Sequence, residues 1–492
     1  MPFIFAAREN AAVEQSLGPP HPSVFDKNGY QFCNHESVGS DPSTDTMAVP
    51  SAGGLSLVAD SCVASSLVSY SPKSSIINNP RNLNLGFSLI KPGNIQRFPS
   101  MPEVNILCSL YSTLRDIIHF PPYIILVTDS IPESVPRSIC GIPAYFTTDD
   151  NDIPLRGEHC RGPPLCIGEV TPLWVLPSFE TRKAIVGNLS SQRVRSLGWG
   201  GTRWLLEVEN PDESTRKSLP RMINGLIASY RAYTQSSEYG LHRAKAPTSV
   251  QIDNTDYSPF LHAGMLVSNG DMFTTSGCPV QRLDDPETRY FTITSHGFVT
   301  GADVFHPVPP PLGRKVGIAD VKFRETNIGL CKITDPTINY TLDCFAGEMG
   351  SIRLRSLKKE SECCIGKELY IDSPFTGLGV GIVEMHGLRA IPIDEPDPKW
   401  HYAANLWMSF QNGVEDPLPG CCGSPLFDDQ GDVYAFFRYF RTDGTATSYC
   451  PCPDPLITAG YVIASPSPPD SGNVSDVEND SGVSREDGHE VG

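Results

Sequence analysis

Short apolar runs separated by glycine and proline turns dominate the second half of the chain, from about residue 256 to residue 465. One example is Gly264–Val267, which is followed by an Asn269-Gly270 turn and then by Phe273–Thr275. An Asn-Gly pair between two apolar runs is a strong hairpin signal, because both turn residues adopt positive φ angles easily. Little helical periodicity interrupts this pattern. It therefore predicts a mainly β domain, a barrel or sandwich, over residues 256–465.

Composition excludes several classes of protein. The 492-residue chain contains 42 glycines and 45 prolines, which favour strands and turns over long helices. Its formal net charge of −18 argues against a general nucleic-acid binder, which usually has a basic surface. No apolar run has the length of a membrane span, and Met1–Arg8 lacks the features of a signal peptide. We therefore expect no nucleic-acid partner, no membrane and a cytoplasmic location.

The 15 cysteines are an odd number, and none of them follows the C-x-x-C spacing of a zinc site. Without an export signal, we expect most of them to be reduced and to serve as small, buried apolar side chains. We expect no metal and no cofactor.

Composition also divides the chain into five segments. They are residues 1–100, rich in Ser, Pro and Asn and mostly disordered; 101–240, a small α+β module; 241–255, a linker; 256–465, the β-rich domain; and 466–492, an acidic disordered tail. Within the module we expect strands at Tyr123–Val127 and Thr202–Val208. Apolar residues at helical spacing predict one helix from Pro220 to Tyr230, and we expect a second helix over Pro177–Leu197.

The segment Glu415–Phe427 constrains function more than any other, and it reads Glu-Asp-Pro-Leu-Pro-Gly-Cys-Cys-Gly-Ser-Pro-Leu-Phe. Acyl transfer needs a nucleophile, a base within hydrogen-bond reach and donors for the oxyanion. A thiol is a good nucleophile because its thiolate forms readily. We predict that Cys422 is the nucleophile, and that the N–H groups of Gly420 and Cys422 form the oxyanion hole. We predict that His296, at the end of a β-rich run 126 residues upstream (422 − 296), is the base.

These motifs resemble those of the trypsin-like serine/cysteine peptidase superfamily. Gly420–Leu426 is similar to its nucleophile motif, with cysteine in place of serine as in picornavirus-type cysteine proteases. Thr294–Gly297 is similar to its histidine motif. The cysteine module is also similar to that of uncharacterised fungal proteins with a variable N-terminal part. The resemblance covers residues 256–465, and it implies a trypsin-like double β-barrel and a protein or peptide substrate.

The resemblance also assigns a residue that orients the base. Thr326–Ile333 is similar to the strand that normally begins with the acidic member of the catalytic triad, and Asn327 stands in place of that acid. An asparagine can hold the imidazole by accepting a hydrogen bond from its ring N–H. Asp320 or Glu325 could serve instead, because both lie close in sequence.

Three residues are expected to bind substrate on the same grounds. Asp416 lies where trypsin-like enzymes place the base of the primary specificity pocket. Val433–Phe440, which includes Arg438 and Tyr439, matches the strand that lines the substrate cleft in this superfamily.

Three functions remain open. The first is a cysteine endopeptidase. The second is a catalytically inactive trypsin-like scaffold that binds proteins, because the nucleophile exchange, the missing acid and the unusual Cys421 all fit a loss of catalysis. The third is a thiol redox sensor built on Cys421 and Cys422, which is disfavoured because adjacent cysteines form only a strained disulfide ring. The oligomeric state is not indicated.

Overall fold

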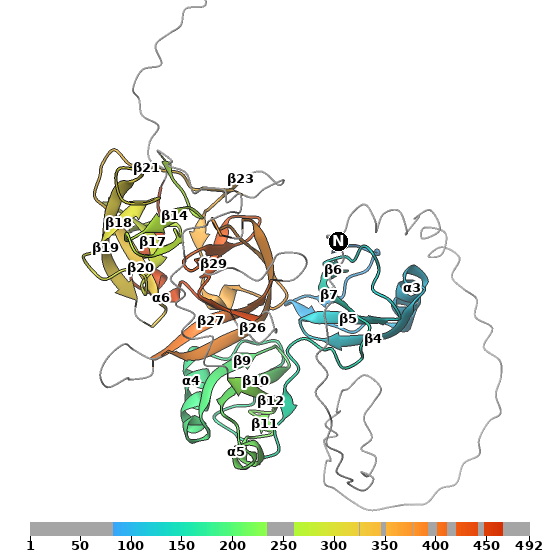
Figure 1. The fold of residues 1–492 in the computed structure, drawn as a ribbon. Helices are drawn as coiled ribbons and strands as arrows, with labels where there is room; N and C mark the ends of the chain where they lie inside the picture. Colours follow the sequence, from blue (N-terminus) through green and yellow to red (C-terminus); the bar gives the residue numbers. More distant parts are fainter. Residues whose placement is uncertain are drawn as a thin grey trace, which may run out of the picture. The chain divides into compact units, whose positions relative to one another are not determined.

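The computed structural model describes residues 82–233, 260–323, 325–345, 351–375, 377–391, 401–410, 420–440 and 447–465 (Figure 1). The larger part of the two segments predicted to be disordered, the linker 241–255 and Asp416 lie outside these residues. None of the described helices is long and apolar enough to cross a membrane.

Strands predominate over helices in the described part of the chain, which confirms the mainly β prediction. The α-helices are α3 (Met101–Leu110), α4 (Phe179–Asn188), α5 (Glu213–Ser218) and α6 (Asp454–Thr458), and Ser190–Gln192 and Glu360–Glu362 form short 3-10 helices. Three small sheets pair β2 (Ile90–Lys91) with β3 (Ile95–Gln96), β13 (Phe260–Leu261) with β21 (Asn339–Tyr340), and β22 (Asp343–Phe345) with β23 (Ser351–Arg353).

A five-stranded sheet forms the first larger element. Its strands, in spatial order, are β1 (Asn82–Leu83), β6 (Ser138–Ile139), β7 (Ile142–Thr147), β5 (Tyr123–Thr128) and β4 (Leu114–Phe120). The strand predicted at Tyr123–Val127 is confirmed as β5. All six of its residues are buried, as expected for a continuous apolar run in the centre of a sheet.

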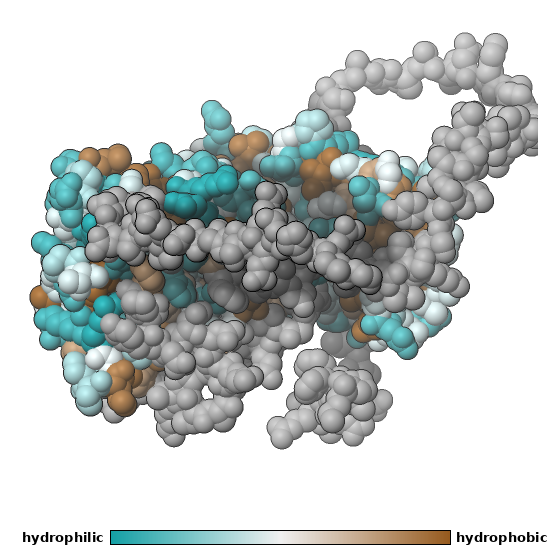
Figure 2. All heavy atoms as spheres, turned by 90° about the horizontal axis from the view of Figure 1, so that it is seen from above, coloured by the Kyte–Doolittle hydropathy of each residue, from teal (hydrophilic) through white to brown (hydrophobic). Residues whose placement is uncertain are grey.

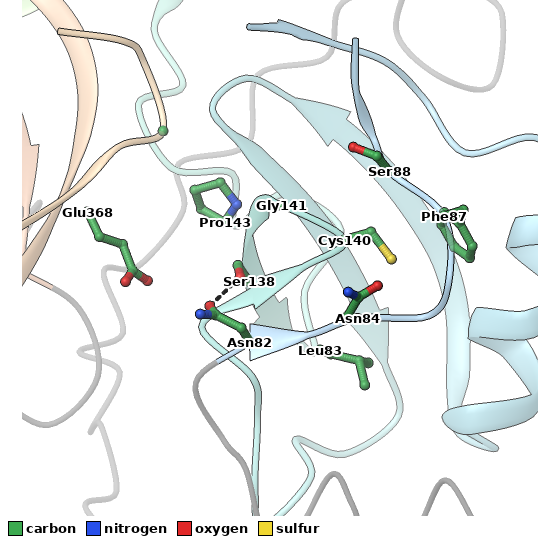
Figure 3. A pocket seen from close by; sticks show the side chains of 11 residues that line it. Asn82, Leu83, Asn84, Phe87, Ser88, Ser138, Cys140, Gly141, Pro143 and Glu368 are labelled. Atoms are coloured by element: carbon green, nitrogen blue, oxygen red, sulfur yellow. Dashed lines mark hydrogen bonds between the residues drawn. The ribbon is translucent and has the colours of Figure 1, made fainter. Parts of the chain in front are cut away.

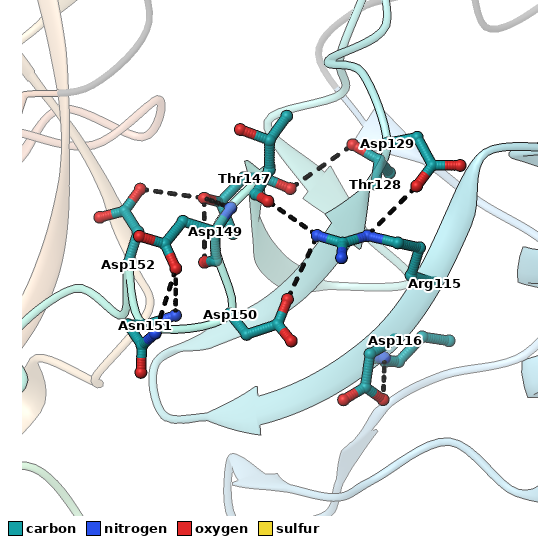
Figure 4. A network of polar contacts seen from close by, with 11 residues as sticks. Arg115, Asp116, Thr128, Asp129, Thr147, Asp149, Asp150, Asn151 and Asp152 are labelled. Atoms are coloured by element: carbon teal, nitrogen blue, oxygen red, sulfur yellow. Dashed lines mark hydrogen bonds and ion pairs between the residues drawn. The ribbon is translucent and has the colours of Figure 1, made fainter.

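An acidic turn after β7 is organised around Arg115 of β4 (Figure 4). The Arg115 guanidinium donates to the carbonyl of Thr148 at 2.7 Å and forms ion pairs with Asp129 and Asp150. Asp152 accepts hydrogen bonds from the hydroxyl groups of Tyr145 and Thr147. The carboxylates are thus engaged in fixing the turn, and in the described residues no group of acidic, His and Cys side chains is arranged to hold a metal.

The largest sheet crosses from the N-terminal module into the β-rich domain. Its main path is β11 (Met222–Ile223), β12 (Leu226–Tyr233), β10 (Arg203–Glu209), β9 (Val194–Trp199), β26 (Gly379–Ile391), β25 (Glu368–Ile371), β28 (Pro425–Phe427), β29 (Asp432–Phe436) and β24 (Ser356–Leu357). Off this path, β27 (His401–Ser409), β31 (Thr447–Pro451), β30 (Tyr439–Phe440) and β8 (Glu158–His159) pair with its strands or with one another. The pairing of β9 with β26 joins residues 196–199 to residues 386–389 in one ladder. The boundaries predicted from the sequence between the module 101–240, the linker 241–255 and the β-rich domain 256–465 remain a prediction.

The helix predicted from Pro220 to Tyr230 is wrong, because this segment forms the hairpin β11–β12. Asn224 and Gly225 have φ angles of 47° and 83°, so they form the positive-φ turn that an Asn-Gly pair favours. That local signal outweighs the helical spacing of the apolar residues. The second predicted helix is correct only in its first half, where α4 lies, because the chain turns into β9 at Val194.

An eight-stranded sheet carries the candidate base. Its order is β15 (Phe273–Thr275), β14 (Leu266–Ser268), β18 (Asp303–His306), β19 (Arg314–Phe323), β20 (Ile328–Ile333), β17 (Asp285–Thr294), β16 (Pro279–Arg282) and β32 (Tyr461–Ile463). The β14–β15 hairpin confirms the Asn269-Gly270 prediction. Buried residues of these strands pack with Phe427, Val433 and Phe436 in one hydrophobic core, so this sheet and the β28–β29 strands are packed together.

The hydrophobic residues on the face shown in Figure 2 form separate small patches among hydrophilic ones. Apolar residues scattered in this way are normal on a protein surface.

A buried carboxyl group links β5 to β26. Tyr123 donates a hydrogen bond of 2.8 Å to Glu384, which is 2% exposed. Burial raises the pKa of Glu384 to about 7, although Tyr123, Arg231 and Arg203 all favour the ionised form. A carboxyl group with a raised pKa contributes stability that is fully present below about pH 4.5 and is lost as the pH rises through about 7.

We predict that Glu384→Gln increases the free energy of unfolding at pH 8 by roughly 2–4 kcal/mol, with a change less than half as large at pH 5.5. The amide oxygen still accepts from Tyr123 but never ionises. Urea unfolding at both pH values measures the difference. Glu180→Gln, at a 78% exposed side chain of α4, is the control and should change neither value. An equal effect of Glu384→Gln at the two pH values would contradict this account.

Candidate active site

His296 lies in the turn that follows β17, next to the start of β20. The two strands pair up to Thr294 and Ile328, and the N–H of Ser295 donates to the carbonyl of Asn327 at 2.8 Å. This ladder fixes the backbone on both sides of the turn. It therefore brings His296 and Asn327, which are 31 residues apart, into direct contact.

Asn327 is buried and contacts the imidazole as predicted, but its amide donates the hydrogen bond to the ring instead of accepting one. Its Nδ2 lies 2.9 Å from Nδ1 of His296 and 2.8 Å from Oγ1 of Thr294, while its Oδ1 accepts from Ser295 at 2.8 Å. Here the amide donates to the ring, whereas an orienting asparagine must accept from it. The hydroxyl groups of Thr294 and Ser295 can each donate or accept a hydrogen bond. A 180° rotation of the Asn327 amide would therefore keep both partners and let its oxygen accept from the imidazole.

The φ angle of Asn327 is 60°, in the left-handed region that asparagine adopts more readily than most residues. The backbone here therefore favours asparagine independently of any role in catalysis. Thr294 also contacts Nδ1 of His296, an interaction that the sequence did not reveal. The two alternative acids lie elsewhere, because Asp320 accepts from Tyr290 and, among the described contacts, neither it nor Glu325 reaches the ring.

Cys422 lies in the glycine-flanked loop before β28. Gly420 and Gly423 have φ angles of 111° and 96°, and a Cβ at Gly423 would lie 2.6 Å from the carbonyl oxygen of Thr275. The loop is held by hydrogen bonds from Gly423 N–H to Phe437 and from Thr275 N–H to Cys422. These contacts dock the loop onto β15 of the other sheet, which brings the candidate nucleophile toward the side of the molecule that carries His296.

The carbonyl groups of the loop are anchored by side chains. The carbonyl oxygen of Gly420 accepts from Thr275 Oγ1 at 2.9 Å, and that of Cys422 accepts from Thr274 Oγ1. Within the described residues, the N–H of Cys422 donates to no backbone carbonyl. An oxyanion donor must be available in this way. The oxyanion hole of Gly420 and Cys422 remains a prediction.

Cys421 and Cys422 occupy different environments. Cys421 is fully buried in a hydrophobic core, where its sulfur accepts from Ser373 at 3.2 Å. Cys422 is half-buried, and its thiol donates to the carbonyl oxygen of Arg438 at 3.1 Å. The two adjacent thiols are therefore not exposed together, as a redox-sensing pair would require.

Arg438 is the residue that the base and the nucleophile share. It follows β29, and its Nη1 contacts both ring nitrogens of His296, at 3.1 Å for Nε2. Its carbonyl oxygen is the acceptor for the Cys422 thiol. The described residues show no hydrogen bond between Cys422 and His296. The sequence assigned Arg438 to substrate binding and gave no sign that its side chain reaches the imidazole.

The electrostatics keep both candidate catalytic groups neutral. Burial and the positive charge of Arg438 hold the pKa of His296 well below its usual value. Burial raises the pKa of the Cys422 thiol, although Arg438 partly offsets this. Near pH 7 this arrangement therefore favours a neutral imidazole and a thiol over an imidazolium–thiolate pair.

Of the other two residues predicted to bind substrate, the structure describes one, Tyr439. Tyr439 belongs to β30, directly after Arg438. Asp416 lies outside the described residues. A small cavity of about 10 Å³ at the site is lined by residues of both sheets, among them Asn327, Gly423 and Arg438, so these segments meet in space.

A second cavity, of about 470 Å³, lies far along the chain from these residues, and Figure 3 shows its lining. Cys140 lines it beside Asn84 and Ser138, and Ser138 donates to Asn82 at 2.6 Å. Burial raises the pKa of Cys140. The cavity contains none of the predicted catalytic residues.

Solved structures similar to part of this chain include a glutamic acid specific serine protease, which is 15% identical with a TM-score of 0.32 and covers 41% of this chain and 100% of its own. Thermobifida fusca Protease A is 13% identical with a TM-score of 0.31, and Cellulomonas bogoriensis chymotrypsin is 12% identical with the same score. Each covers 42% of this chain and 100% of its own. No family model and no curated protein matches the chain. At TM-scores this low the similarity carries no argument, and the function proposed below rests on contacts within this chain.

The docking of the Cys422 loop predicts the effect of a single methyl group. A Cβ at Gly277 would lie 1.8 Å from Oγ1 of Thr292 and 2.9 Å from the carbonyl oxygen of Gly423. We expect Gly277→Ala to lower the free energy of unfolding by about 1–3 kcal/mol. Gly187→Ala, where a Cβ on α4 meets nothing within 4 Å, should instead be neutral or stabilising by up to about 1 kcal/mol. Urea unfolding compares them, and equal effects would argue against the tight junction.

The contact between residue 327 and the imidazole predicts a pKa change. Asn327→Asp places a carboxylate beside Nδ1, which stabilises the imidazolium and raises the pKa of His296. Hydrogen–deuterium exchange at the histidine C2 position, read by mass spectrometry across pH, measures this. His119, whose pKa burial lowers to about 4, is the internal control and should not change. An unchanged pKa of His296 would show that residue 327 does not face the ring.

Proposed function

We propose that this chain is a cysteine endopeptidase with the double β-barrel fold of trypsin-like enzymes, in which Cys422 is the nucleophile and His296 the base. The observation that carries the proposal is a convergence of residues from two sheets. His296 and Asn327 come from the turns at one end of β17 and β20, while Cys422 and Arg438 come from the turns beside β28 and β29. Direct contacts join His296 to Asn327 and to Arg438, and Arg438 to Cys422.

In the proposed reaction, His296 takes the proton of the Cys422 thiol, and the thiolate attacks the peptide carbonyl carbon. The N–H groups of Gly420 and Cys422 would stabilise the oxyanion that forms. His296 then gives the proton to the leaving amine, which leaves a thioester on Cys422. Water, deprotonated by His296, hydrolyses the thioester and releases the acid. Asn327, with its amide rotated, would hold the ring by accepting from Nδ1–H. No metal or cofactor takes part in these steps.

The arrangement described above is a resting one in this proposal. Arg438 contacts both nitrogens of the imidazole, its charge opposes the imidazolium, and the Cys422 thiol donates to the Arg438 carbonyl instead of to the ring. Proton transfer therefore requires that the Arg438 side chain move away from His296. Catalytic contacts often form only when substrate is bound, so an empty site with a longer nucleophile–base separation is compatible with activity.

An extended peptide has a place to bind beside Arg438. Within the described residues, β30 pairs with β31 alone, and the proposed substrate peptide would add to the other edge of this short strand. A peptide that adds to this edge forms main-chain hydrogen bonds with Tyr439 and Phe440 and passes the Arg438 side chain. This placement supports the substrate-binding roles predicted for Arg438 and Tyr439.

A second candidate function is an inactive scaffold that binds proteins. The contact of Arg438 with both ring nitrogens favours it, because a permanent cation at that position prevents His296 from acting as a base. The two functions therefore differ in one physical respect, which is whether the imidazole can be freed. A protein or peptide ligand is common to both, and the absence of a nucleic-acid or membrane partner remains a prediction.

We predict that Arg438→Gln increases peptide cleavage by about one to two orders of magnitude, because it frees the imidazole to act as a base. A peptide library digested by the full chain and read by mass spectrometry measures the rate. The Cys422→Ala variant gives the background, and Arg282→Gln, which removes an exposed arginine paired with Asp284, is the matched control. If Arg438→Gln cleaves no more than Cys422→Ala, the endopeptidase proposal fails and the scaffold function is favoured.

A further inference from the structure

A cavity of about 520 Å³ lies within the N-terminal module. Neither Cys422 nor His296 lines it, and both lie far from its lining residues in the sequence. Its volume is within the range of small-ligand pockets. Segment 156–161, α5 and the strand β12 surround it, and Figure 1 shows α5 close to β11 and β12. Arginine is the commonest residue type in its lining, with Arg156, Arg161 and Arg216.

The backbone that carries two of these arginines is held closely in place. Gly157 packs so near to β12 that a Cβ would lie 2.9 Å from the carbonyl oxygen of Tyr230, and a Cβ at Gly162 would lie 2.5 Å from that of Ser218. The β8–β12 pairing and a hydrogen bond of 2.7 Å from Gly162 N–H to Leu219 complete the attachment. Arg156 and Arg161 therefore extend from a fixed segment, which reduces the entropy lost when they bind a ligand.

The charges around this cavity do not balance. Of its two carboxylates, Glu158 accepts from the buried Tyr230 hydroxyl and lies 3.7 Å from Arg216, and Glu213 lies 3.4 Å from Lys217. Both are thus matched. Within the described residues, the Arg156 guanidinium donates only to the Asn151 side chain, at 3.4 Å, and the Arg161 side chain has no ion pair or hydrogen bond.

Two arginines whose side chains have no carboxylate partner within the described residues therefore line one cavity in a protein whose net charge is −18. Guanidinium groups bind carboxylates and phosphates through paired N–H donors. A phosphate monoester carries a charge of about −1.5 to −2 at pH 7, which matches two guanidinium groups better than a single carboxylate does.

We propose that this cavity binds a phosphate monoester group, with Arg156 and Arg161 as its principal ligands and Arg216 and His159 at its edge. The proposal is independent of the chemistry at Cys422. The phosphate could be carried by a phosphorylated peptide side chain or by a small molecule, and both sources present the same group to the arginines.

Isothermal titration of the full chain with three probes tests the proposal: inorganic phosphate, a phosphoserine peptide and the same peptide with unmodified serine. We expect saturable binding of the two phosphate-containing probes and none of the serine peptide. The Arg156→Gln/Arg161→Gln double variant should bind at least about tenfold more weakly, since hydrogen bonds to charged groups are lost. Lys183→Gln, which removes an exposed cation on α4, should bind like the wild type.

The outcomes separate the two sources. Binding of the phosphopeptide much more tightly than inorganic phosphate would assign the site to a phosphorylated peptide, whereas equal binding would assign it to small phosphate compounds. Glu213→Gln should strengthen binding of both, because it removes a carboxylate from the cavity wall. Absence of saturable binding at millimolar concentrations, or unchanged affinity in a double variant that keeps the wild-type melting temperature, would overturn the proposal.

Discussion

The docking of the glycine-flanked Cys422 loop onto β15 is the interaction on which the candidate site depends. Residues from two sheets meet there only because Gly423 and Gly277 present no side chains at the junction and because Thr274 and Thr275 bind the loop carbonyls. A side chain at either glycine would separate the strand that carries His296 from the loop that carries Cys422. Packing and hydrogen bonding at this junction thus create the geometry that any chemistry at Cys422 would use.

The electrostatics of the site differ from those of an acid-assisted triad. The position where an acid would stabilise an imidazolium holds the neutral Asn327, and the Arg438 guanidinium lies against the same ring. Two effects that lower the pKa of His296, burial and a neighbouring cation, therefore act without a carboxylate to oppose them. The same arginine favours the thiolate of Cys422, so its movement would change the base and the nucleophile together.

Local signals in the sequence predicted more of this structure than non-local ones could. The apolar run at Tyr123 and the Asn-Gly turn at residue 269 were sufficient to place β5 and the β14–β15 hairpin. The same Asn-Gly signal at Asn224 was outweighed in the sequence interpretation by apolar residues at helical spacing, and the predicted helix proved to be a hairpin. The contact of Arg438 with His296 depends on how two sheets pack, and no local pattern encodes it.

The pH dependence of Cys422 alkylation by iodoacetamide, read site by site by mass spectrometry, measures directly whether Arg438 keeps the base and the nucleophile apart. We predict that wild-type Cys422 shows no reactive plateau near neutral pH and reacts only at a higher pH than an ordinary thiol, whose pKa is about 8.5, because burial raises its pKa. We also predict that Arg438→Gln gains a reactive plateau below neutral pH, which disappears when His296→Ala is added. A wild-type protein that already shows this His296-dependent plateau would contradict the account, because its imidazolium–thiolate pair would then form with Arg438 in place.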